Sequence, residues 1–168
     1  MNKKQLTLVI FGRCLISLFF IFSAVYKVID WTESERALVN VFGDWQAYMS
    51  SASFWQQMFS FLMDWAWMIL ALIIFLELTA GIFIFLGYQV KLASAALMLF
   101  LAVITVLLHH FWFLSGEKRE LHMMFFFKNM AVLGSLLLLM AINTKKSQVA
   151  SPFGGNRPSM SNLNNHFD

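Results

Sequence analysis

A single carboxylate, Glu77, interrupts an apolar run over residues 65–86. A helix of that length, rising about 1.5 Å per residue, can cross the roughly 30 Å hydrocarbon core of a membrane with Glu77 near its middle. An unpaired charge there costs about 2.5 to 3.5 kcal/mol, so Glu77 should face other helices and have a cationic partner. Counting helical rise inward puts Glu77 about 18 Å deep and Arg13 about 24 Å deep. We therefore expect Arg13 and Glu77 to form a buried ion pair. It could serve only to lock helix register, or Glu77 could act as a proton carrier.

A second set of polar side chains collects nearer to one membrane face. The same count puts Lys27 about 3 Å deep, His109 about 6 Å deep and Lys128 about 9 Å deep. The expected members of this outer pocket are Lys27, His109, Trp112, Lys128 and Asn129. His109 and Lys128 could donate hydrogen bonds to the oxygen atoms of a neutral ring, and a histidine can supply a proton near neutral pH. The alternative is that these groups only join neighbouring helices.

The elements that must position these residues are membrane helices. The 168 residues are 60% hydrophobic and only 12% charged, with a mean hydropathy of +0.69, whereas soluble domains carry about 25% charged residues. Long apolar runs occupy residues 6–29, 65–86, 90–114 and 123–142. We expect an all-α fold in which these four runs form an integral membrane four-helix bundle.

Several classes of site are excluded by residue type. The single Cys14 leaves no internal disulfide and no cysteine-based metal site, and a zinc site lacks ligands. A b-type haem would need histidines at matching depth on two helices, whereas His122 and His166 fall in a connection and a tail. His110 is turned about 100° away from His109 on a helical wheel and is the weaker candidate. The net charge of +3 is too small and scattered to indicate a nucleic-acid partner.

The connections between the runs differ in character. Residues 30–64 are acidic, and two capping-box spacings, Thr32 with Glu35 and Ser53 with Gln56, predict two short amphipathic helices on the membrane surface; an ordinary solvated loop is the alternative. Residues 115–122 form a short loop. Residues 143–168, rich in Ser, Asn, Gly and Pro, predict a disordered cytoplasmic tail, which leaves residues 1–142 as the transmembrane domain.

The distribution of basic residues predicts the orientation. If both termini are cytoplasmic, six basic residues lie in cytoplasmic segments or at the cytoplasmic end of a run, and three lie in the segments on the other side. The six are Lys3, Lys4, Lys91, Lys145, Lys146 and Arg157, and the three are Arg36, Lys118 and Arg119. This bias favours cytoplasmic termini.

The same residues, taken in order between positions 10 and 142, carry a family resemblance. They are Arg13 with Lys27, Glu77 with Gly81, Leu86-Gly87, then His109-His110-Phe111-Trp112, and Phe127-Lys128-Asn129 followed by Ala131 and Gly134. This pattern resembles the DoxX family of small four-helix membrane proteins. Its most specific portions are the HHFW and FKN stretches. The family often has an acid beside that histidine, where this chain has His110.

The resemblance implies a bacterial inner-membrane protein. Members are linked to thiosulfate:quinone oxidoreduction or to redox-stress complexes, and many have no assigned activity. Two function classes follow: a membrane subunit of a quinone-linked redox system with a redox partner protein, or a non-catalytic scaffold or small transporter component. Since the sequence offers no nucleophile, metal cage or phosphate loop, we do not expect autonomous catalysis. The sequence does not determine the oligomeric state.

Overall fold

The computed structural model describes the backbone of residues 3–49 and 53–149, and side chains as far as residue 142. Over these residues the chain forms α-helices and one short 3₁₀ turn, and no strand. The elements are α1 (Lys3–Ile29), α2 (Trp31–Tyr48), α3 (Ser53–Asp64), α4 (Ala66–Leu86), α5 (Val90–Leu108), η1 (Phe111–Phe113) and α6 (Gly116–Val149). The predicted all-α fold is confirmed.

Four of the helical segments are long and apolar enough to cross a membrane. They are Lys3–Ile29, Ala66–Leu86, Val90–Phe113 and Gly116–Ile142. Large apolar side chains such as Phe75 and Leu99 point away from the protein and stay more than half exposed. Since a soluble protein rarely exposes such a continuous apolar surface, the chain is a multi-pass membrane protein.

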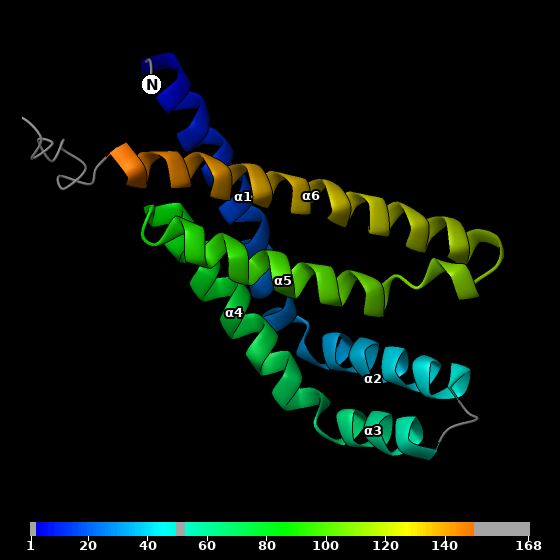
Figure 1. Cartoon of the computed structure of the whole chain (residues 1–168). Coiled ribbons are helices and arrows are strands. Elements are labelled where there is room, and N and C mark those ends of the chain that lie inside the picture. The colour runs from blue at the N-terminus through cyan, green and yellow to red at the C-terminus, as the bar shows by residue number, and fades with distance from the viewer. Residues whose placement is uncertain (1–2, 50–52, 150–168) are drawn as a thin grey trace, which may run out of the picture.

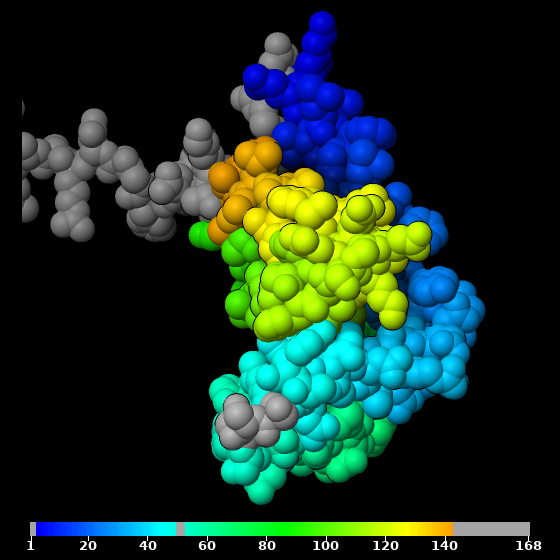
Figure 2. Space-filling view, turned by 90° about the vertical axis from the view of Figure 1, so that its right-hand side faces the viewer, coloured from blue at the N-terminus to red at the C-terminus, as the bar shows by residue number. Residues whose placement is uncertain are grey.

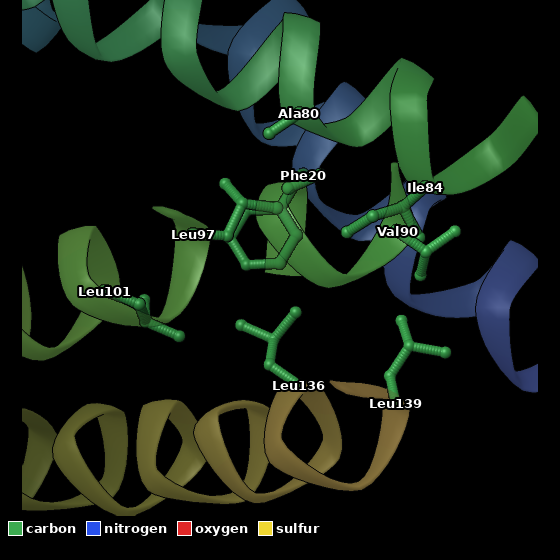
Figure 3. Packing of buried hydrophobic residues seen from close by; sticks show 9 residues of the cluster. Phe20, Ala80, Ile84, Val90, Leu97, Leu101, Leu136 and Leu139 are labelled. Carbon is green, nitrogen blue, oxygen red and sulfur yellow. The ribbon is translucent and has the colours of Figure 1, made fainter. Parts of the chain in front are cut away.

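The four spans pack as two pairs of helices. α1 packs mainly against α4, α5 packs mainly against α6, and contacts between α4 and α5 join the pairs. Figure 1 shows α5 and α6 running side by side while α1 and α4 cross them obliquely. Side chains from all four spans meet where the pairs join, among them the fully buried Phe20, Ile84, Leu97 and Leu136 (Figure 3).

A glycine brings α1 and α4 into close approach. A Cβ atom on Gly81 would lie 3.0 Å from Ile21 Cγ1 and 3.4 Å from the Ser17 carbonyl oxygen, both on α1. In lipid the hydrophobic effect does not drive helices together, so their association depends on dispersion contacts, and small residues allow the close approach that these contacts require. α4 ends at Leu86 and is capped by Gly87, whose positive φ of 77° suits glycine.

The two short helices predicted in the first connection are present as α2 and α3. α2 begins at Trp31, and Asp30, not Thr32, occupies its N-cap position, without a side-chain capping bond. The two helices lie side by side at one end of the bundle (Figure 1) and bury Phe42 and Phe59 against each other. We call this the α2–α3 end. That these helices rest on the membrane surface stays a prediction.

The connection between the last two spans differs from the expected loop at residues 115–122. α5 ends at Leu108, and α6 already begins at Gly116, so His122 lies on a helix and not in a loop. α6 also continues to Val149, past the boundary expected at residue 142. Residues 150–168 lie outside the described residues, so the disordered tail stays a prediction.

Candidate functional site

The partner of Glu77 is Lys27, and the expected pair with Arg13 does not form. α1 and α4 run antiparallel, with Ser17 beside Gly81 and the Arg13 guanidinium beside Gly87. In this register Arg13 lies at the C-terminal end of α4, and the last turn of α1, which contains Lys27, lies opposite Glu77. Depths counted along separate helices missed this arrangement because they assume that each helix runs straight across the membrane.

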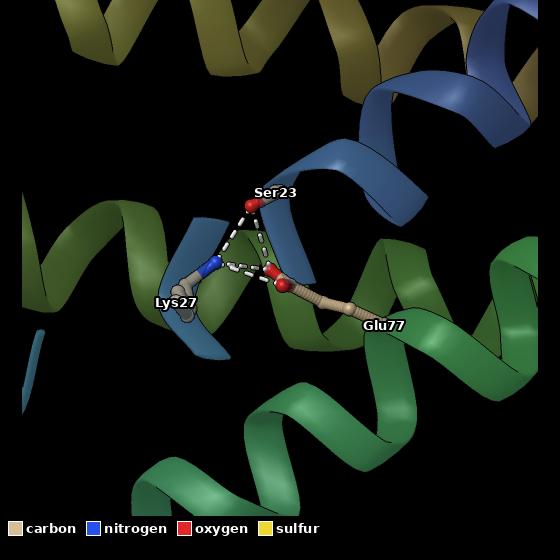
Figure 4. Close-up of polar contacts among 3 residues, drawn as sticks. All are labelled: Ser23, Lys27 and Glu77. Carbon is tan, nitrogen blue, oxygen red and sulfur yellow. Dashed lines mark hydrogen bonds and ion pairs between the residues drawn. The ribbon is translucent and has the colours of Figure 1, made fainter. Parts of the chain in front are cut away.

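The ion pair is compact and shielded (Figure 4). Lys27 Nζ donates to Glu77 Oε2 at 2.7 Å and to Oε1 at 3.0 Å. Ser23, one turn earlier on α1, accepts from Lys27 Nζ at 2.6 Å and donates to Glu77 Oε1 at 3.4 Å. The Glu77 side chain is 5% exposed and that of Lys27 is 25% exposed. A cation in the last turn of α1 also interacts favourably with the helix dipole.

The ion pair forms part of the wall of a cavity of about 650 Å³. Residues from α1, α2, α4, α5 and α6 line this cavity. Figure 2 shows the side of the molecule on which α6 (yellow) lies next to α2 (light blue to cyan). Most of the lining is aromatic or aliphatic, including Phe20, Leu38, Leu70, Ile73, Phe100 and Leu101. The volume and the apolar lining are typical of a site for a small lipophilic molecule.

Four of the five residues expected in the outer pocket line this same cavity. Lys27, His109, Lys128 and Asn129 are all among its lining residues, together with Glu77. Glu77 from the expected deep pair therefore shares one cavity with the outer residues, whereas Arg13 is not among the lining residues. Trp112 does not line the cavity: its side chain is 44% exposed and packs against Phe113 and Phe126.

Lys128 and His109 present hydrogen-bond capacity that the described protein does not use. Lys128 Nζ lies 4.9 Å from the ring centroid of Phe125 and 6.0 Å from that of Phe19, and no carboxylate in the described part of the chain pairs with it. His109 Nδ1 is buried and has no hydrogen-bond partner among the described residues. A cation and a buried ring nitrogen without a protein partner suit a ligand that supplies an oxygen acceptor.

Asn129 plays a different part from the other two residues of the cavity wall. Its amide nitrogen donates to Thr105 Oγ1 at 3.0 Å, across the interface between α6 and α5. Thr105 Oγ1 in turn donates to the Leu101 carbonyl oxygen. Asn129 is thus engaged in holding α6 against α5.

His110 is buried, contrary to the expectation from the helical wheel. Its side chain is 1% exposed, and its Nδ1 donates to the Leu107 carbonyl oxygen at 3.0 Å. The helical wheel turned His110 away from the core, but α5 ends at Leu108, so the wheel no longer describes the residues that follow. No sequence signal marked this helix end, because the apolar run continues to Leu114 without glycine or proline. Over the described residues, no three His, Cys, Asp or Glu side chains converge as metal ligands would.

Comparison with known proteins supports the resemblance seen in the sequence. The DoxX family model matches residues 8–110, which is more than half of the chain. The chain belongs to the DoxX family. No curated protein and no solved structure gives a significant match. The DoxX match covers Lys27, Glu77, His109 and His110, while Lys128 and Asn129 lie beyond it.

Proposed function

We propose that this DoxX family protein binds a lipid-soluble quinone in the cavity, as a membrane subunit of a quinone-linked redox system. The observation that carries the proposal is the cavity itself: about 650 Å³, mostly apolar, and lined by the exposed Lys128 and by His109, whose buried Nδ1 has no hydrogen-bond partner among the described residues. Sites of about 300 to 1,000 Å³ with a few convergent polar groups are typical of small-molecule binding between helices.

The polar groups have distinct parts in this proposal. Lys128 donates to a ring oxygen and stabilises negative charge that develops there during reduction. His109 donates a hydrogen bond to a ring oxygen or delivers a proton to that oxygen. The Lys27 and Glu77 pair keeps the opposite wall polar without leaving a net charge there. Electrons come from a redox partner protein, so the chain is assigned no autonomous catalysis.

A small transporter component is the second candidate function. The observation that favours it is that Glu77, a carboxylate deep in a membrane span, reaches the wall of the cavity beside Lys27. Ionisable residues inside membrane spans commonly mark proton or substrate paths. A scaffold without any ligand is the remaining alternative.

Quinone titration monitored by tryptophan fluorescence separates these functions. The purified protein is titrated with ubiquinone or menaquinone, in parallel with the His109→Ala, Lys128→Ala double variant and with Trp112→Phe as the matched control outside the cavity. We expect saturable quenching in the wild type and in the control. The double variant should bind the quinone at least about tenfold more weakly, which is the effect of losing one charge-assisted hydrogen bond. Equal quenching by a folded double variant would contradict the proposal.

We further propose that the protein resides in the bacterial inner membrane with both termini in the cytoplasm. The six-to-three bias of basic residues supports this orientation, which places the α2–α3 end outside. In a Cys14→Ser background, Ala47→Cys should react with an impermeant maleimide on intact cells, and Lys91→Cys should react only after permeabilisation. The reverse pattern would invert the orientation.

A further inference from the structure

We propose that His110 and Asp44 form a proton-dependent contact that holds α2 in place and so sets the width of the cavity. The inference deepens the proposed function, because it concerns regulation of the same site. Only the identity of the molecule that the cavity binds rests on the proposed function. The contact itself lies at the α2–α3 end, outside the cavity.

The hydrogen bonds of His110 define which nitrogen can take up a proton. Nδ1 donates to the Leu107 carbonyl oxygen at 3.0 Å, so in the neutral ring Nε2 is the unprotonated nitrogen. Nε2 is buried and lacks a hydrogen-bond partner among the described residues. It lies 3.9 Å from Asp44 Oδ2 on α2. In the neutral state two acceptors therefore face each other, and proton uptake at Nε2 converts this pair into a donor and a carboxylate.

The surroundings of His110 leave Asp44 as the group that responds to its charge. From α2, Trp45 and Tyr48 pack on the imidazole, with ring centroids 5.6 Å and 5.7 Å away. His122 on α6 lies 5.9 Å away, and its Nδ1 is engaged by the Leu108 carbonyl oxygen. The remaining titratable neighbours are the Tyr48 hydroxyl and the adjoining His109. In the part of the chain that the structure describes, Asp44 is the carboxylate within ion-pair distance of this ring.

The position of α2 matters because this helix forms one wall of the cavity. Ser34, Ala37 and Leu38 of α2 line the cavity together with Lys128 and Asn129 of α6. The Trp45 indole N–H donates to the Leu107 carbonyl oxygen at 2.9 Å in either protonation state, so α2 remains attached. Protonated His110 adds a second attachment to the same region and draws α2 inward, while neutral His110 lets it loosen.

Distance measurements between spin labels test this without any ligand. In a Cys14→Ser background, nitroxides are attached at Ala47→Cys on α2 and Glu120→Cys on α6, both exposed positions. The full chain in lipid nanodiscs is measured at about pH 5.5 and pH 8, which bracket the range in which histidines titrate. We expect a shorter and narrower distance distribution at the lower pH.

Three variants assign the response. Asp44→Asn should abolish the pH dependence and keep the fold, since the Asp44 side chain is 58% exposed. Glu33→Gln, the matched loss of one negative charge on α2, should leave the response intact because Glu33 pairs with Arg36. His110→Phe should give the looser distribution at both pH values.

A wild-type distribution that does not change with pH, or a response that survives Asp44→Asn or disappears with Glu33→Gln, would overturn the proposal. Quinone titration is independent, so either result can fail alone.

Discussion

At the scale of single residues, the sequence located the buried charge but not its partner. Glu77 could be singled out because a lone carboxylate in an apolar run needs compensation wherever the fold places it. Choosing between Arg13 and Lys27 required the register of α1 against α4, which residue spacing within one helix does not contain. His109 and Lys128 were predictable as inward donors, whereas burial of His110 follows from a helix end that the apolar pattern conceals.

A double-mutant cycle tests the pairing of Glu77 with Lys27. Glu77→Gln and Lys27→Gln should each lower the free energy of unfolding by up to about 3 kcal/mol, since each leaves a charge without its partner, moderated by the partial exposure of Lys27. The double variant should lose less than the sum, with a coupling energy of about 0.5 to 3 kcal/mol. Thermal unfolding in detergent provides the measurement.

Arg13→Gln is the control for that cycle. Arg13 lies beside Gly87 and is absent from the hydrogen bonds of Glu77, so its effect should add to that of Glu77→Gln within about 0.5 kcal/mol. Strong coupling of Glu77 to Arg13, together with additivity between Glu77 and Lys27, would show that the pairing is wrong.

At the scale of the elements, the close contact between α1 and α4 decides which residues face the cavity. Gly81 sets this contact, because any side chain there meets Ile21 and the Ser17 carbonyl. Hydropathy predicted the four spans. Two short helices were one of two alternatives for the first connection, and Thr32 of the first capping signal does not cap α2. The sequence could not predict that α5 ends at Leu108, since tertiary contacts at the α2–α3 end, such as the Trp45 bond to Leu107, stabilise that end.

A matched pair of glycine variants tests the importance of this crossing. Gly81 and Gly134 are both inside membrane helices, but a Cβ at Gly134 would meet nothing within 4 Å. Alanine improves helix propensity equally at both, by about 1 kcal/mol, whereas overpacking should cost about 1 to 3 kcal/mol at Gly81 alone. Gly81→Ala should therefore unfold at lower temperature than Gly134→Ala. Identical shifts would mean that α1 and α4 do not approach as closely as described.

At the scale of the whole molecule, two helix pairs and the α2–α3 end enclose one cavity. Composition predicted a membrane protein, and the four apolar runs predicted a multi-pass bundle. The HHFW and FKN stretches carried the resemblance to the DoxX family. The meeting of Glu77 and His109 in one cavity was not predictable, because it arises from helices that cross obliquely. A site between five helices is a property of their crossing angles, which hydrophobic periodicity leaves undetermined.

Photolabelling tests the central claim, that this cavity binds a quinone, most directly. A quinone carrying a photoreactive group on its tail is irradiated with the purified protein in nanodiscs, and adducts are located by mass spectrometry. We expect adducts on buried cavity residues such as Ile73 and Leu38 that excess unlabelled quinone suppresses. Labelling of the lipid-facing Phe75 and Leu99 should be weak and insensitive to competitor. Adducts confined to those lipid-facing residues, or cavity labelling that competitor leaves unchanged, would contradict a quinone site in the cavity.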